Sequence, residues 1–261
     1  MKKQSLSKGK IYGYLYKRKS SSILFLFVWY KTYKRSKDIR RNNILIATLR
    51  MTTSQIRIEG AVGKELAVKT WNVQQICVMM SAILNCDLAW YFQADRSVEK
   101  FSADTDIHII MENMYKMPNE CIELSDEKCS FLETRIEKAC KLAEVNEKFY
   151  LATNAMWSYR LNFMPAIKIS VIWSGIEALF MIDHNIKNTI ATVSSRFIYG
   201  NDDKIEDIKN LYKEARCKAT HEYQNGTYDL YKKSNELLYK LILKCIDEGH
   251  TPDVNYILTI F

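Results

Sequence analysis

Hydrophobic residues in the second half of the chain recur at spacings of three and four, which is the period of one face of an α-helix. The stretches with this pattern run from about Glu147 to Asn162, Pro165 to Phe180, Ile186 to Tyr199, Asp203 to Thr220 and Tyr228 to Glu248. Pro165 suits the first turn of a helix, and Gly200 and Gly249 suit helix ends. We therefore predict a helical bundle, preceded by a lead-in helix within residues 120–145.

The region before the bundle shows a mixed pattern. Glu65 to Phe92 has helical spacing, whereas Gln55–Glu59 and Asp106–Met111 alternate in the manner of strands. His108 lies in the second alternating stretch, and we interpret it as a strand-surface histidine rather than a metal ligand. The tail from Thr251 to Phe261 ends in apolar residues, so we expect it to dock as a strand. With 8 Gly and 3 Pro, the chain is poor in the tight turns of all-β proteins, and 48% apolar residues suffice for a core.

The predicted fold class is therefore mainly α, with a C-terminal helical bundle and a smaller mixed α/β N-terminal region. Charge divides the chain further. Residues 1–50 hold 14 of the 38 Lys and Arg and one of the 30 Asp and Glu, so residues 51–261 carry 24 basic and 29 acidic side chains. We divide the chain into a basic arm or extension (1–50), a mixed helix and strand region (51–118) and the bundle (119–261).

Residues 1–50 admit three interpretations. Their basic residues flank an apolar run, residues 23–30, that is far shorter than the ~20 residues of a membrane-spanning helix, so we expect no transmembrane span. The segment is a basic arm that contacts nucleic acid or an acidic membrane surface, a short element docked on the body, or an extension upstream of a true start at Met51. The abrupt change in composition at Met51 gives weight to the third interpretation.

The seven cysteines form no CxxC pair and no cluster with zinc-type spacing. They indicate buried or free thiols in a reducing compartment, so we expect a cytoplasmic protein without a metal site. The sequence also lacks the glycine-rich motifs GxxxxGK[ST] and GxGxxG that hold nucleotide phosphates, and we expect no cofactor.

Candidate chemistry is concentrated in the hexapeptide from Arg216 to His221, near the end of a predicted helix. An arginine holds a phosphate through a fork of donors, and a histidine exchanges a proton near neutral pH. Together they form a minimal set for cutting RNA without a metal. For the hexapeptide alone, a solvated arginine and a helix-capping histidine are the simpler interpretation. A separation of five residues places positions 216 and 221 about 140° apart around a regular helix. The two side chains can therefore face one pocket only if the helix ends or kinks between them, or if a second subunit completes the site.

Glu177 is the second unusual position, because it lies in an otherwise apolar helix. Burying a glutamate is costly unless it is paired. The pattern leaves open whether Glu177 is exposed or pairs with Arg196 or Arg216. Because the chain beyond residue 50 is net acidic, an RNA site would draw its positive charge from Arg216 and the nearby Lys209, Lys213 and Lys218.

Residues from about 151 to 249 resemble the HEPN superfamily, and within it the Apea-like branch. The residues that carry the resemblance are Trp173 to Phe180 (WSGIEALF), Ser194 to Phe197, Ile208 to Arg216, and His221. The family signature is an arginine, four to six residues and a histidine, and four residues intervene here. Members are all-α bundles. Active members are metal-independent ribonucleases that work as homodimers, with the arginine and histidine pairs in a shared cleft.

The resemblance implies a ribonuclease of defence or toxin–antitoxin systems, with RNA as substrate and an antitoxin or another protein as partner. Cleavage through the 2′-hydroxyl would leave a 2′,3′-cyclic phosphate. The implied catalytic residues are Arg216 and His221, and the implied supporting residues are Glu177, Arg196, Tyr212 and Lys218. The sequence departs from the family pattern at Cys217, where a polar residue is usual, and at Glu222, where glycine is usual. A non-catalytic module of the same fold that binds RNA or a protein is therefore the alternative.

Overall fold

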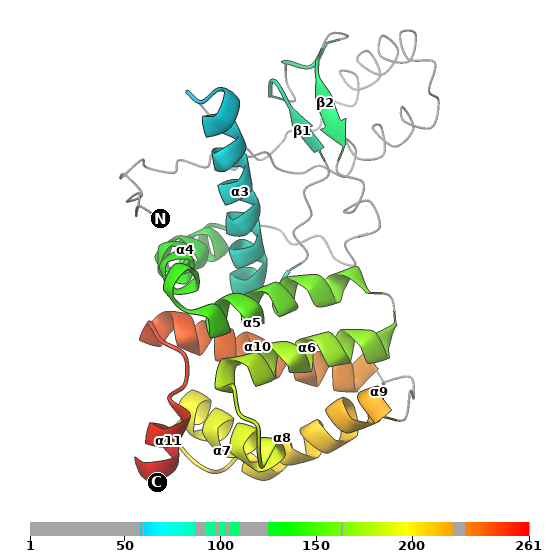
Figure 1. The fold of residues 1–261 in the computed structure, drawn as a ribbon, viewed down its shortest axis with the longest axis vertical. Helices are drawn as coiled ribbons and strands as arrows, with labels where there is room; N and C mark the ends of the chain where they lie inside the picture. Colours follow the sequence, from blue (N-terminus) through cyan, green and yellow to red (C-terminus); the bar gives the residue numbers. More distant parts are fainter. Residues whose placement is uncertain are drawn as a thin grey trace. The chain divides into compact units, whose positions relative to one another are not determined.

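The computed structural model describes residues 58, 60–86, 92–97, 100–102, 105–109, 125–162, 164–221 and 228–260, and this part of the chain is mainly α-helical (Figure 1). The chain divides into two compact units. One consists of Met1–Val73 and Trp90–Tyr115, the other of Gln74–Ala89 and Lys116–Phe261. The basic arm, residues 1–50, lies outside the described residues. Of the strand predicted at residues 55–59, Ile58 is described, and it belongs to no helix or strand.

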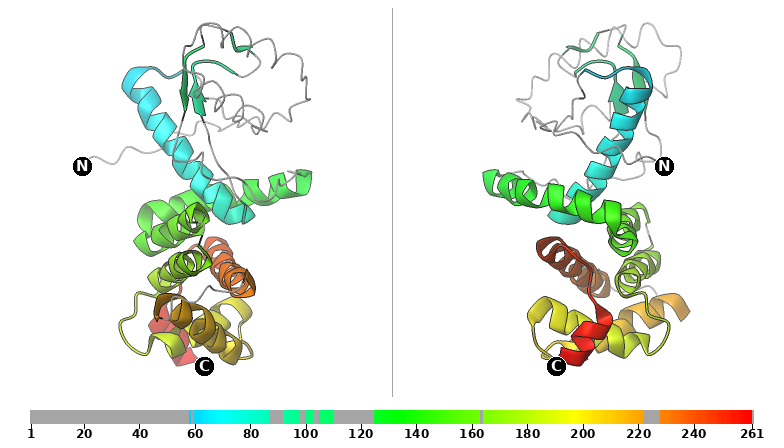
Figure 2. Two further views of the ribbon diagram at one scale, coloured as in Figure 1. Left: turned by 90° about the vertical axis from the view of Figure 1, so that its right-hand side faces the viewer. Right: turned by 60° about the vertical axis from the view of Figure 1, so that its left-hand side comes forward.

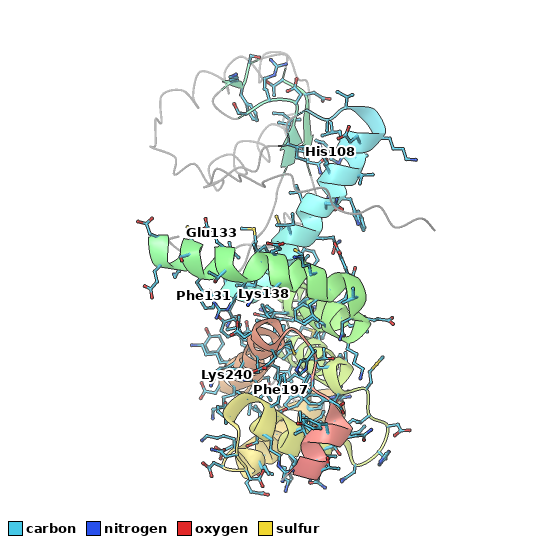
Figure 3. The ribbon with its side chains drawn as sticks, turned by 90° about the vertical axis from the view of Figure 1, so that its left-hand side faces the viewer. His108, Phe131, Glu133, Lys138, Phe197 and Lys240 are labelled. Atoms are coloured by element: carbon cyan, nitrogen blue, oxygen red, sulfur yellow. The ribbon has the colours of Figure 1, made fainter. Side chains whose placement is uncertain are left out.

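The described part of the first unit contains the first turns of helix α3 (Gly63–Leu84) and a two-stranded antiparallel sheet. Strand β1 (Phe92–Ala94) pairs with β2 (Ile107–Ile109), with Gln93 opposite His108. The strand predicted near residues 106–111 is therefore confirmed for its described part. His108 is exposed, as the alternating pattern predicted (Figure 3).

The predicted helix from Glu65 to Phe92 is wrong at its C-terminal end. Helix α3 ends at Leu84, and Phe92 lies in a strand. Asn85 adopts a left-handed conformation (φ 47°), which asparagine tolerates better than most residues. The side chain of Ser81 donates to the carbonyl of Cys86, and the Cys86 N–H donates back to the Ser81 carbonyl. These bonds close the helix end locally, which an apolar pattern alone does not reveal.

The second unit is the helical bundle. Its helices in chain order are α4 (Asp126–Val145), α5 (Glu147–Ser158), the 3₁₀ turn η3 (Tyr159–Leu161), α6 (Pro165–Phe180), α7 (Ile186–Tyr199), α8 (Ile205–Leu211), the π-helical turn η4 (Tyr212–Cys217), α9 (Lys218–His221), α10 (Tyr228–Glu248) and α11 (Val254–Ile260). Helices α5, α6 and α10 pack against one another at its centre (Figures 1 and 2). Phe149, Trp173 and Leu238, one from each of these helices, are completely buried.

The predicted helix boundaries in the bundle are confirmed closely, because local signals set them. The side chain of Asn146 accepts the N–H of Phe149 at 3.1 Å and begins α5. Pro165 occupies the first turn of α6. Gly200 ends α7 with a φ of 72°, a conformation that favours glycine. The first of these helices was predicted to end at Asn162, and η3 continues the chain beyond α5 as far as Leu161.

The strand predicted for the C-terminal tail is wrong, because residues 254–260 form helix α11, which packs against α7. The side chain of Asp253 accepts the N–H of Tyr256 at 3.1 Å, and its carbonyl accepts the N–H of Ile257 at 3.0 Å. Asp253 therefore caps the helix, and Pro252 directly precedes this cap. The apolar end of the tail concealed this start signal.

Gly175 sets the distance between α5 and α6. A Cβ atom at this position would lie 2.6 Å from the Cβ of Ala155 and 3.5 Å from the carbonyl oxygen of Ala152. Neither atom belongs to a flexible side chain, so the two helices can approach this closely only because residue 175 has no side chain.

Gly175→Ala is expected to lower the free energy of unfolding by about 1–3 kcal/mol, because the added methyl group forces the two helices apart. Ser174→Ala is the matched control: Ser174 is exposed on the same helix, and its loss should change stability by less than about 0.5 kcal/mol. Chemical denaturation followed by circular dichroism measures both. Equal stability of Gly175→Ala and the wild-type protein would contradict the close approach.

Candidate functional site

The central feature of the candidate site is an ion pair between Arg216 of η4 and Glu177 of α6. The Nε of Arg216 lies 2.9 Å from Oε1 of Glu177. The side chains are 23% and 26% exposed, so the pair lies at the edge of the core, within reach of solvent. Of the alternatives that the sequence left open for Glu177, the structure shows the pair with Arg216. Glu177 holds the guanidinium in place through its Nε–H.

The backbone beneath Arg216 is unusual. The predicted helix over residues 203–220 begins as α8, widens into the π-helical turn η4 and continues as α9. Its predicted apolar face is confirmed, since Ile208, Ala215 and Ala219 are buried. Wide turns of this kind are rare and occur frequently at functional sites. Here the turn carries Tyr212 and Arg216, which both contact Glu177.

Tyr212 and Trp173 connect the ion pair to the interior. The Tyr212 hydroxyl donates to Oε1 of Glu177 at 3.5 Å, a long bond. The rings of Tyr212 and Trp173 meet edge to face at a centroid distance of 5.1 Å. The indole N–H of the completely buried Trp173 donates to Oγ of Ser234 on α10 at 3.1 Å. Partial burial, and after it the charge of Glu177, raises the pKa of the Tyr212 phenol. Tyr212 therefore stays neutral and acts as a donor.

The structure describes His221 through its backbone, as the last residue of α9, and its side chain lies outside the described part. The wide turn ends at Cys217, so most of the path from Arg216 to His221 is regular α-helix. The two positions therefore remain about 140° apart around the axis. The wide turn changes the direction of Arg216 relative to α8 but does not by itself bring positions 216 and 221 to one side.

Arg196, predicted as a supporting residue, takes part in a different contact. Its guanidinium forms a two-point ion pair with Asp202, with N–O distances of 2.6 and 3.1 Å. It also donates to the carbonyl of Ile257 at 3.3 Å. The hydrogen bond from Arg196 lowers the pKa of the Asp202 carboxyl. These contacts connect the end of α7 to the following loop and to α11, which is a structural role.

The cations predicted to supply positive charge near Arg216 are largely paired with carboxylates. Lys209 contacts Glu206 at 2.7 Å, and Lys218 forms an ion pair with Glu214. The hydrogen bond from Lys218 lowers the pKa of Glu214. Lys213 is exposed. The positive charge around Arg216 is thus smaller than a count of basic residues suggested.

The thiols of the described residues agree with the prediction of free cysteines. Six of the seven cysteines are described, and these six are thiols outside any disulfide bond. Burial raises the pKa of Cys77 and of Cys140 to about 11 and that of Cys245 to about 12. Cys217, beside Arg216, is a half-buried free thiol. In the described part of the chain, no three His, Cys, Asp or Glu side chains gather as metal ligands, and none of the helices there is long and apolar enough to cross a membrane.

Two parts of this site were not predicted from the sequence. Ser234 had a signal, because it is a small polar residue on the apolar face of α10, among Leu237, Leu238 and Leu241. A polar residue at such a position indicates a buried donor opposite it, here the indole of Trp173. The π-helical turn had no recognisable signal, since it adds no glycine or proline to the helix.

No family model, curated protein or solved structure matches this chain. Its function is therefore inferred from its own residues.

Proposed function

We propose that this protein is a metal-independent endoribonuclease of HEPN type, with Arg216 and His221 as its catalytic residues. The ion pair between Arg216 and Glu177 is the observation that supports the proposal most strongly. It joins two segments that carry the family resemblance and holds a guanidinium at the edge of the core, where a phosphate can approach it.

The proposed reaction uses the nucleophile that RNA itself contains. The 2′-oxygen attacks the adjacent phosphorus, and the bond from phosphorus to the 5′-oxygen breaks. This leaves a 2′,3′-cyclic phosphate and a 5′-hydroxyl, and the nucleophile is already held near the phosphorus. His221 of one subunit accepts the proton of the 2′-hydroxyl, and His221 of the partner subunit donates a proton to the leaving oxygen. Arg216 stabilises the charge that develops on the phosphate oxygens.

A homodimer is part of the proposal for a geometric reason. Positions 216 and 221 lie on different sides of one helix, so Arg216 of one chain and His221 of the same chain are poorly placed for one phosphate. In the proposed dimer the two-fold axis runs between the arginine of one copy and the histidine of the other, so that the two copies together complete one site. Such a site exists only in the dimer. A bound antitoxin or similar protein that separates or covers the two copies would silence it.

The second candidate function is a non-catalytic module that binds RNA or a protein. The pairing of Lys209 and Lys218 with carboxylates supports this alternative with a protein, rather than RNA, as the bound partner, because this pairing reduces the local attraction for a polyanion. The experiment that separates the two functions is incubation of the dimeric protein with single-stranded RNA, and with DNA of the same sequence, in the presence of EDTA. The proposal predicts cleavage of the RNA alone. The binding module would cleave neither.

Glu177 is a positioning residue in this proposal, so Glu177→Gln should lower kcat about 10- to 100-fold through misplacement of the guanidinium. The free energy of unfolding should change by less than about 1 kcal/mol, since the pair is partly solvated. Glu206→Gln removes the carboxylate partner of Lys209, a more exposed ion pair on α8, and serves as the control. Steady-state cleavage kinetics and a denaturation curve give both readouts. An unchanged kcat in Glu177→Gln would show that the ion pair has a structural role alone.

A further inference from the structure

Four side chains at one end of the bundle form a surface group that we name the tyrosine–lysine cluster: the exposed Tyr228 and Lys232 and the half-buried Tyr231 of α10, and the half-buried Lys168 of α6. The rings of Tyr228 and Tyr231 lie 5.9 Å apart between centroids, tilted by 41°. The Nζ of Lys232 lies 4.5 Å from the ring centroid of Tyr228, and the Nζ of Lys168 lies 5.3 Å from that of Tyr231. The first turns of α6 and α10 lie at the same end of the bundle (Figure 1).

The inner side of the tyrosine–lysine cluster packs on ordered side chains of the bundle. The ring of Tyr231 meets the ring of Tyr159 edge to face at 5.7 Å, and Tyr159 is 2% exposed. The guanidinium of Arg160 covers the Tyr159 ring at 4.6 Å. It also donates to the side chain of Asn85 at 3.0 Å. Three segments of the bundle therefore hold the inner side chains of the cluster in place. Because these side chains are already ordered, little side-chain entropy is lost when a ligand binds.

The outer part of the cluster is accessible and carries basic side chains. Tyr228 is 63% exposed, so much of its side chain is accessible to a ligand. Lys232 and the neighbouring Lys233 are exposed. Among the described residues, no carboxylate pairs with Lys168 or Lys232, whereas Lys209 and Lys218 near Arg216 both have carboxylate partners. The cluster therefore combines an exposed ring with cations that lie against rings.

We infer that the tyrosine–lysine cluster is a binding platform for single-stranded RNA. An unpaired base stacks on the exposed face of Tyr228, and Lys232 and Lys168 contact the adjoining phosphates. This combination of a stacking ring and a basic surface is what binding of unpaired strands requires, and it tolerates any base because every base has an aromatic face. A duplex keeps its bases stacked inside the helix, so it offers the phosphates alone.

The position of the cluster relates it to the proposed catalytic residues. Tyr228 follows His221 by seven residues, so their Cα atoms lie within about 25 Å of each other. A strand bound at the cluster can therefore extend toward His221. The assignment of unpaired RNA as the substrate that is cut rests on the proposed function, but the binding of RNA at the cluster does not.

The test measures binding by full-length protein carrying His221→Ala, which keeps the RNA intact. Fluorescence anisotropy follows a short labelled single-stranded RNA, the same sequence as a duplex, and a labelled polyglutamate peptide. Tyr228→Ala and Lys232→Ala are compared with two matched controls in other helices. Tyr256→Ala removes a tyrosine of 64% exposure from α11, and Lys141→Ala removes a lysine of 72% exposure from α4.

Tyr228→Ala should weaken binding of single-stranded RNA about tenfold, the loss of one stacked base, and Tyr228→Phe should restore it. Lys232→Ala should weaken both single-stranded and duplex RNA, and the controls should match the parent. Unchanged binding of single-stranded RNA in Tyr228→Ala would overturn the inference. So would a loss confined to polyglutamate, which would identify the cluster as a surface for an acidic protein. Cleavage by the wild-type protein is scored separately, so a failed ribonuclease proposal and a failed platform give different results.

Discussion

His221→Ala and Arg216→Ala are each expected to lower the rate of RNA cleavage by about 10²- to 10⁴-fold. The histidine supplies general acid and base catalysis, and the arginine stabilises the charged transition state. Arg216→Lys should restore little activity, because a lysine is a point charge and cannot offer the fork of donors that Glu177 orients. Initial rates on a labelled RNA give the effect of each variant.

The chain offers matched controls for both substitutions. His184 is an exposed histidine in the loop before α7, and His184→Ala should leave the rate unchanged. Arg135 pairs with Asp247 at 3.0 Å and is 23% exposed, the same fraction as Arg216, so Arg135→Ala removes an arginine of similar surroundings. Loss of activity in the controls as well would point to general destabilisation. Full activity in His221→Ala would contradict the proposed mechanism.

Trp173→Ala is expected to lower the free energy of unfolding by about 3–5 kcal/mol, the largest stability effect that we predict. The indole is completely buried between Tyr212 and Ser234, so its removal leaves a large cavity and an unpaired hydroxyl. Chemical denaturation measures the change. Trp71→Ala is the control, since Trp71 of α3 is 62% exposed and its loss should have a small effect.

Ser234→Ala separates the hydrogen bond from the packing. It leaves the buried indole N–H without its acceptor, which should cost about 1–3 kcal/mol. In Trp173→Phe the donor is already absent, so the same serine substitution should cost much less. If the losses in the free energy of unfolding from the two substitutions are additive, the hydrogen bond between Trp173 and Ser234 contributes nothing to stability. A loss of less than about 1 kcal/mol in Trp173→Ala would contradict the central position of the indole.

Most of the bundle could be predicted from the sequence because its boundaries depend on local signals. Pro165 and Gly200 mark helix ends through the conformations they favour, and apolar spacing identifies the buried faces. The predictions were wrong where two local signals favoured different structures. Asn85 ended α3 inside a run that still had helical spacing, and Asp253 began a helix in a tail that ended in apolar residues.

The candidate site was predicted in part. The pairing of Glu177 with Arg216 was one of the alternatives, since a glutamate in an apolar helix needs a cation. The partner of Arg196 could not be identified from the sequence. Asp202 lies six residues away in a loop, and the sequence does not distinguish it from carboxylates in more distant segments. The π-helical turn beneath Arg216 packs against α6 and α10, and its residues include no glycine or proline that would signal it. The tyrosine–lysine cluster joins residues more than sixty positions apart, so spacing along the chain did not indicate it.

The measurement that tests the central claim most directly is an analysis of the RNA ends produced by the wild-type protein in EDTA. The protein is first shown to be dimeric by light scattering, and the RNA is then incubated and its termini are identified. The proposed mechanism predicts 2′,3′-cyclic phosphate and 5′-hydroxyl ends from RNA, with no cleavage of DNA. Dimeric protein that binds the RNA and leaves it intact would contradict the account and establish the binding module instead.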